Sequence, residues 1–127
     1  MKRIEFLDKA AEREATFDEI GVFYKFGRAY FTAIVNGNER IDFSDAIHES
    51  DVDPILAECR RFGVTEFTVS SGFSSIVERI AAFEDGGCRL EGMVKVKGDF
   101  NAFGTQKRII LPAFLLRVLP EGGAEND

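Results

Sequence analysis

The chain has 127 residues, 45% of them hydrophobic and 30% charged, which is the size and balance of one globular domain with a single core. Its net charge of -6 argues against sequence-independent binding to nucleic acid, because phosphate backbones are also negative. The first residues meet acid before any apolar run forms, and no stretch approaches the ~20 apolar residues of a membrane span. We therefore expect a cytoplasmic protein without a signal peptide or membrane contact.

Phenylalanine supplies the core that this composition predicts. The chain has 13 Phe residues and no Trp. Each buried Phe contributes about 1.5–3 kcal/mol of transfer free energy, so the domain needs neither a disulfide nor a metal. Cys59 and Cys88 lack the spacing of a CxxC pair or a zinc site, and we expect both to be reduced and buried, the first in a helix and the second at a strand start. We predict no cofactor.

The N-terminal third of the chain is charged at first and then apolar. Residues 1–16 are expected to form a separate N-terminal segment with at most a short helix. Residues 17–36 favour a helix, because apolar side chains recur at spacings of three and four and Asn36-Gly37 is a typical helix end.

A hairpin is the alternative for residues 17–36. Residues 30–35 are rich in strand-forming types, Asn36-Gly37 is a favoured two-residue turn, and residues 40–43 could return. We favour the helix because Lys25 and Arg28 then fall on one side. Such a helix is apolar over most of its circumference, so it must meet either residues 1–16 or a second copy of the chain. We favour a homodimer, because residues 8–14 offer little apolar surface.

The middle of the chain is expected to be a loop followed by a helix. Residues 38–50 are interpreted as loop. The stretch from Ser50 to Pro54 supplies cap residues, acids and an early proline, which together indicate a helix start. That helix ends at Gly63, which follows two arginines in the last turn.

The most informative segment is residues 64–97, which predicts strand, helix and strand. Residues 65–70 form the first strand and residues 88–97 the second, with Leu90, Gly92, Val94 and Val96 on one face. A helical crossover between two such strands implies a parallel pair. A third strand covers residues 109–118, after a loop at 98–107.

These elements predict a single α/β (α+β) domain over residues 17–119 with a disordered tail at 120–127. Two or three helices would pack against a small mixed sheet of three strands, built around the parallel β-α-β unit at 64–97. A sheet this small leaves open edges, so a homodimer could also form by extending it.

The serine turn between strand and helix is the strongest candidate ligand site. Its residues are Ser70, Ser71, Gly72, Ser74 and Ser75. Strand-to-helix turns of this kind attract anions, but the turn has no phosphate-binding fingerprint and no basic neighbour. Ser75 and Glu78 have the spacing of a capping box, so we expect the hydroxyls to cap the helix rather than bind a ligand.

Two other clusters are weaker candidates. The run from His48 to Asp53 holds the chain's single histidine and three acids, which helix capping explains without a metal, and no catalytic set can be assembled around it. A basic set near the third strand adjoins Phe100 and Phe103, which is a weak pattern for stacking single-stranded nucleic acid; its members are Arg89, Lys95, Lys97, Lys107 and Arg108.

The segments Phe67–Ser75, Gly86–Lys95 and Ala113–Val118 resemble an uncharacterised family of small bacterial proteins that recur beside mobile-element genes. The resemblance covers about residues 17–118, implies a helix over 17–36 and carries no catalytic residue. We therefore expect a non-enzymatic interaction or regulatory protein, an accessory of a mobile element, with a protein partner. The alternative is a small-ligand-binding domain or degenerate enzyme that uses the Ser70–Ser75 turn.

Overall fold

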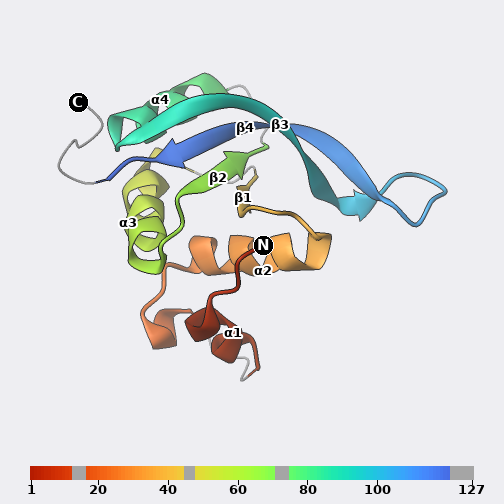
Figure 1. Ribbon diagram of the computed structural model, residues 1–127, viewed down its shortest axis with the longest axis horizontal. Coiled ribbons are helices and arrows are strands. Elements are labelled where there is room, and N and C mark those ends of the chain that lie inside the picture. The colour runs from red at the N-terminus through yellow and green to blue at the C-terminus, as the bar shows by residue number, and fades with distance from the viewer. Residues whose placement is uncertain (13–16, 45–47, 71–74, 121–127) are drawn as a thin grey trace.

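A four-stranded mixed sheet carries the helices of this chain in the computed structural model, which describes residues 1–12, 17–44, 48–70 and 75–120 (Figure 1). The α-helices are α1 (Glu5–Glu12), α2 (Tyr24–Asn36), α3 (Val52–Phe62) and α4 (Ile76–Asp85), and the strands are β1 (Asp42–Phe43), β2 (Glu66–Val69), β3 (Cys88–Asn101) and β4 (Arg108–Val118). The mixed α+β class is confirmed. The prediction of three strands is wrong, because β1 lies in the segment that we interpreted as loop. The predicted tail lies outside the described residues from 121 onward.

The parallel pair of strands is not the predicted one. The strand order is β1-β2-β4-β3, with β1 and β2 parallel and β4 antiparallel to both of its neighbours. The strands β2 and β3 therefore run in the same direction but are separated by β4. The short connection at 102–107 returns β4 directly along β3, so this local hairpin takes the place that we had assigned to β2. The parallel β-α-β unit is instead β1-α3-β2.

A bulge in β3 overturns part of its predicted alternation. Leu90 pairs with Leu116 and Gly92 with Leu115, so Glu91 is an extra residue. Because Leu115 and Leu116 face opposite sides of the sheet, Leu90 and Gly92 do too. Gly92 has a φ of 143°, a conformation that suits glycine. The predicted face holds only from Gly92 onward.

The segment at 17–36 is α-helical, as the favoured interpretation predicted, but only from Tyr24 onward. A short 3₁₀ turn at Asp18–Ile20 precedes α2, which starts at Tyr24 and ends at Gly37 with a φ of 75°. The left-handed glycine closes a helix here instead of a hairpin turn. The end of α3 at Gly63 has the same geometry and was predicted correctly.

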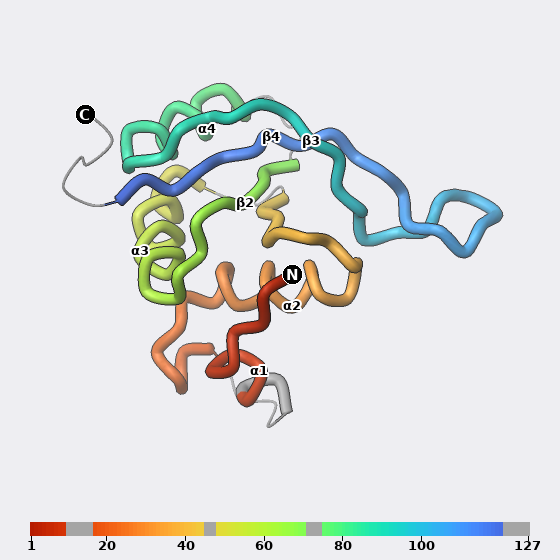
Figure 2. The backbone as a smooth tube through the Cα atoms, viewed as in Figure 1, coloured from red at the N-terminus to blue at the C-terminus, as the bar shows by residue number. Residues whose placement is uncertain are grey.

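The N-terminal residues cover the apolar helix α2. Figure 2 shows α1 on the side of α2 that faces away from the sheet. The Leu7 side chain is fully buried, the Tyr30 hydroxyl donates to Asp8 at 2.6 Å, and the amide of Ile4 donates to the same hydroxyl at 2.8 Å. Phe17 stacks on Phe31 with ring centres 6.0 Å apart. The N-terminal residues thus cover the aromatic side of α2, and this helix does not need a second copy of the chain.

The core is a row of phenylalanine rings that joins four elements. Phe26 of α2 meets Phe43 of β1 at 6.4 Å, Phe43 meets Phe67 of β2 at 5.3 Å, and Phe67 meets Phe83 of α4 at 5.1 Å between ring centres. All four rings are buried. Tilted and edge-to-face pairs of this kind add stability beyond the burial of their area.

Candidate functional site

A cleft lined by both polar and apolar side chains lies at the edge of the sheet where the parallel strands β1 and β2 end. Ser44 follows β1 and Ser70 follows β2, and both line the cleft with the C-terminal half of α2 and the facing parts of β3 and β4. Its volume is about 280 Å³. The carboxyl ends of parallel strands are the usual place for ligands in open sheets.

The residues of the predicted serine turn do not all fall in one described site. Ser70 lines the cleft, whereas Ser71, Gly72 and Ser74 lie outside the described residues. Ser75 occupies the N-cap position of α4, but its side chain makes no capping hydrogen bond, so the predicted capping box with Glu78 is wrong. The backbone of Ser75 has a ψ of 18°, far from the extended conformation that directs a cap side chain to the free amides.

Ser75→Ala is therefore expected to change the free energy of unfolding by less than about 0.5 kcal/mol, the range for a substitution that removes no specific contact. A working cap would cost about 1 kcal/mol. Urea denaturation of the two proteins measures the difference. A loss of about 1 kcal/mol or more would show that the capping bond forms in solution.

Asp42 is a cleft residue that sequence reasoning missed. Its carboxylate accepts hydrogen bonds from the hydroxyls of Thr68 and Ser70, each at 2.6 Å. Burial raises the pKa of Asp42, the two hydroxyl hydrogen bonds oppose that rise, and the charge of Asp99 adds to it. No sequence motif marks this aspartate. The alternation of Ile41, Asp42 and Phe43 was the available signal for a strand with one polar face.

The raised pKa of Asp42 predicts a pH-dependent stability. A folded-state pKa above the unfolded value means that stability linked to Asp42 is present at low pH and is lost as pH rises through the folded pKa. We expect Asp42→Asn to gain on the wild type as pH rises from about 4 to 7. Chemical denaturation across that range measures the gap, and Glu39→Gln controls for the loss of one exposed charge. If Asp42→Asn instead loses stability relative to the wild type as pH rises, the result would contradict the raised pKa.

Two asparagines at the end of α2 fix β3 beside the cleft. The Asn38 side chain donates to the carbonyl of Lys97 at 3.0 Å and accepts from the Lys97 amide at 2.8 Å. The Asn36 side chain, 7% exposed, donates to Asp99 at 2.8 Å. The two amides tie the free edge of β3 to the segment that leads into β1. The outer part of the β3–β4 hairpin is therefore held in one position.

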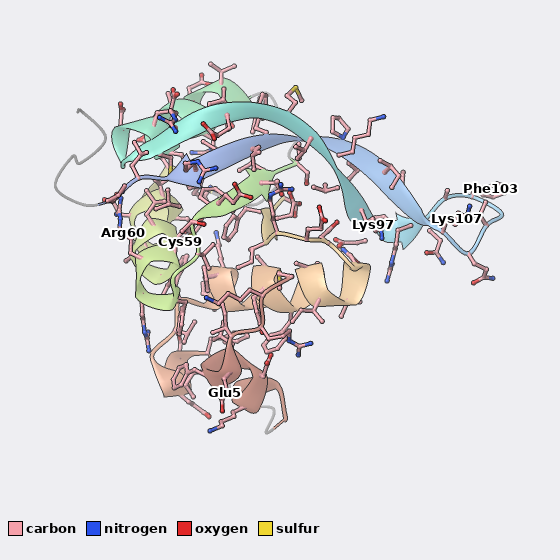
Figure 3. The ribbon with its side chains drawn as sticks, in the orientation of Figure 1. Glu5, Cys59, Arg60, Lys97, Phe103 and Lys107 are labelled. Carbon is pink, nitrogen blue, oxygen red and sulfur yellow. The ribbon has the colours of Figure 1, made fainter. Side chains whose placement is uncertain are left out.

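This outer part of the hairpin, residues 94–113, is called the arm. The last pair that includes β2 is Val69 with Phe114, so from Val94 and Ala113 outward β3 and β4 pair only with each other. Figure 3 shows Lys97, Phe103 and Lys107 along this projecting end, away from Cys59 and Arg60.

The predicted basic set is divided between the two ends of β3. Four of its members lie on the arm, but Arg89 lies at the other end and pairs with Glu91 at 3.0 Å. Within the described residues, no carboxylate pairs with Lys95, Lys97 or Lys107. Phe100 is 75% exposed and Phe103 fully exposed, so the predicted juxtaposition of cations and aromatic rings is present on the arm.

The acidic run before α3 has a structural role. The backbone amide of His48 donates to the Asp51 carboxylate at 2.7 Å, which also pairs with Lys25 of α2. These contacts tie the start of α3 to α2. In the ranges that the structure describes, no three metal-ligating side chains gather in one place.

The two cysteines lie where the sequence placed them. Cys59 is buried in α3 and Cys88 is buried at the start of β3, and both are free thiols. Burial raises the pKa of both thiols, that of Cys88 to about 12. Because the thiolate is the reactive form, neither position suits a nucleophile.

We expect both thiols to resist an aromatic disulfide reagent at about pH 8 until the protein is unfolded. Stability should fall as pH rises from the unfolded value of 9.0 toward about 12, because the folded thiol of Cys88 keeps its proton longer than the unfolded one. In Cys88→Ala this fall should be shallower. Rapid reaction of one thiol in the native protein would show that its burial is incomplete in solution.

In the described part of the chain, no helix has both the length and the apolar character to cross a membrane.

Comparison with known proteins places the chain in a family. No curated protein and no solved structure matches the chain. A family model does match, over residues 25–118, a range that takes in every described strand and the whole lining of the cleft. The chain belongs to the family that this model defines, a domain of unknown function (DUF7698).

Proposed function

We propose that this protein is a non-enzymatic interaction protein whose contact element is the arm. The observation that carries the proposal is the apolar surface that the arm holds in water: Phe100 is 75% exposed, Phe103 fully exposed and Ile110 53% exposed. The phenylalanine rings of the core are buried, so these two are not needed for folding. Exposed apolar groups that gather in one place are typical of binding surfaces.

The proposal also includes the cellular role of the protein. The resemblance of Phe67–Ser75 and Gly86–Lys95 to small bacterial proteins beside mobile-element genes supports a cytoplasmic accessory or regulator of such an element. A homodimer has one remaining support, the position of β3 at the edge of the sheet. Because Asn38 occupies that edge at Lys97 and Glu91 forms a bulge, only a short part of β3 is open to a second copy.

Affinity capture from a bacterial host with matched variants tests the role of the arm. Phe100→Ser with Phe103→Ser removes the exposed rings, and Val35→Ser with Val77→Ser removes apolar side chains that are 70% and 74% exposed on α2 and α4. Both pairs should leave stability within about 0.5 kcal/mol per site, since surface positions rarely cost more. We expect the arm pair alone to lose the partner. Equal recovery, or equal loss, with the two pairs would contradict the proposal.

A small-ligand-binding role is the second candidate, and the cleft favours it. The cleft brings the desolvated carboxylate of Asp42 and the hydroxyl of Ser70 together with the residues Lys97 and Asp99. Groups of both charges suit a small polar ligand that carries both charges itself. A thermal-shift screen with free amino acids and nucleotides tests this role, with Ser70→Ala as the site variant. If no compound raises the melting temperature, or if Ser70→Ala keeps the full shift, the cleft is structural.

A further inference from the structure

The arm and the rest of the chain carry opposite net charges. Between residues 94 and 113 there are four basic residues and one acidic residue, Asp99, so the arm has a net charge of +3. The whole chain has a net charge of -6, which leaves -9 on the remainder. The negative net charge of the whole chain, which argues against nucleic-acid binding, therefore does not describe the arm. The arm is basic, and the rest of the chain, called the body, is acidic.

The lysines of the arm have no acidic partner among the described residues, whereas several arginines of the body do. On the body, Arg40 and Arg117 pair with Glu66 at 2.9 and 3.3 Å, and Glu91 binds Arg117 and Arg89 at 3.0 Å each. On the arm, Lys95, Lys97 and Lys107 pair with no carboxylate of the described residues. Their positive charge is available to a ligand.

Three cationic residues of the arm share a face. Lys95 and Lys97 are alternate residues of β3, so they project on the same side, and Lys97 pairs with Ile110 across the hairpin. Arg108, two residues before Ile110 on β4, lies on that side as well. A hollow of about 400 Å³ runs along Lys95 and Lys97 beside Arg40. This row can follow the phosphates of an extended strand.

The exposed rings lie at the outer end of the same arm. The turn that carries Phe103 is ordered by its own contacts: the Ala102 amide donates to the Lys107 carbonyl at 2.7 Å, and the Thr105 hydroxyl donates to the Ala102 carbonyl at 2.9 Å. A ring held in water on such a turn presents both of its faces. Stacking of a base on an aromatic ring is largely independent of sequence, because every base has a π-face.

We infer that the arm binds single-stranded nucleic acid, with phosphates along the row of Lys95, Lys97 and Arg108 and bases on the exposed phenylalanine rings. The inference rests on the proposed role of the arm as the contact element. An acidic protein would satisfy the lysines but has no need of exposed rings beside them. The acidic body does not prevent binding, because at physiological salt charges are screened over about 8 Å and the arm projects from the body (Figure 3).

Fluorescence anisotropy with a labelled oligothymidine of about 15 nucleotides, spanning the site sizes of known single-strand binders, tests the inference. Lys95→Glu with Lys107→Glu is the site variant, and Lys2→Glu with Lys9→Glu makes the same change in net charge on exposed N-terminal positions. Lys97 is left intact because Asn38 binds its backbone. Phe100→Leu with Phe103→Leu keeps apolar area but removes the rings.

We expect the wild type and the N-terminal variant to bind, with an affinity that falls as salt rises from about 50 to 200 mM. With about three phosphate contacts the slope of log K against log salt should be near -2, and the arm lysine variant, which keeps Lys97 and Arg108, should have a shallower slope than the wild type. The leucine variant should bind at least about tenfold more weakly, since base stacking is worth about 1–3 kcal/mol per base.

Three results would overturn the inference: no binding at low salt, equal weakening in the arm and N-terminal variants, or unchanged affinity in the leucine variant. Failure here is distinguishable from failure of the proposed function. If the oligonucleotide does not bind but capture from the host still depends on Phe100 and Phe103, the arm recognises a protein, and only the nucleic-acid inference falls.

Discussion

Val96→Asp is expected to destabilise the protein by about 3 kcal/mol or more, the cost of an uncompensated buried charge. Val96 lies in β3 and is 6% exposed, while the residues on either side of it are exposed lysines. Aspartate at this position would lose its hydration. The neighbouring Lys95 and Lys97 point to the opposite face of the strand, so neither lysine can pair with the buried carboxylate. Urea denaturation at neutral pH measures the loss.

Lys95→Asp is the matched control, because it places the same side chain one residue away on the opposite face. Its effect should stay within about 0.5 kcal/mol, as for most exposed positions. The sequence pattern pointed to Val94 for this comparison, but Val94 is only half-buried, so Val96 gives the sharper contrast. Similar losses at Val96 and Lys95 would mean that the assigned faces of β3 are wrong.

Local signals in the sequence were sufficient for most elements. Gly37 and Gly63 ended helices because each follows an apolar periodic segment and adopts a left-handed conformation, with φ of 75° and 72°. The strands β2 and β4 were found from runs of apolar and β-branched residues. These assignments depend only on residues within one turn or one strand.

The failures within the sheet involve pairing between segments that are distant in sequence. The two residues of β1 are too few to show a period, and their strand state depends on hydrogen bonds to β2, such as the Thr68 amide to the Ile41 carbonyl at 3.0 Å. The place of β4 between β2 and β3 depends on which strand of the β3–β4 hairpin pairs with the edge of β2. The bulge at Glu91 shifts a register that the alternation of charged and apolar residues had indicated as continuous.

The candidate site was predictable only in part, for the same reason. Ser70 was found because it stands at a strand end next to a helix start. Asp42 and Asn36 reach the cleft from β1 and α2, and neither has a fingerprint in its own segment. The cations and rings of the arm were noted in the sequence as a loose set. Their separation from Arg89, and from the acidic body, follows from the length of the hairpin beyond β2.

Gly27→Ala is expected to destabilise the protein by about 1–3 kcal/mol, the usual cost of overpacking a filled site. In an exposed helix the same change stabilises by about 1 kcal/mol, because glycine is a poor helix former. Here α2 passes against the ring of Phe17, and a β-carbon at position 27 would lie within 3.0 Å of three ring carbons. The ring stacks on Phe31 and has to give up that contact to make room.

Thermal or urea denaturation of a double-mutant cycle with Phe17→Ala separates the two contributions. Once the ring is absent, Gly27→Ala should reverse its sign and stabilise the protein, leaving a coupling energy of about 1–3 kcal/mol between the two positions. Additive effects would contradict the packing of Phe17 on α2. The result bears on association as well as stability. If Phe17 and the N-terminal residues cover α2 in solution, a single chain covers the aromatic side of this helix and α2 does not need a second copy.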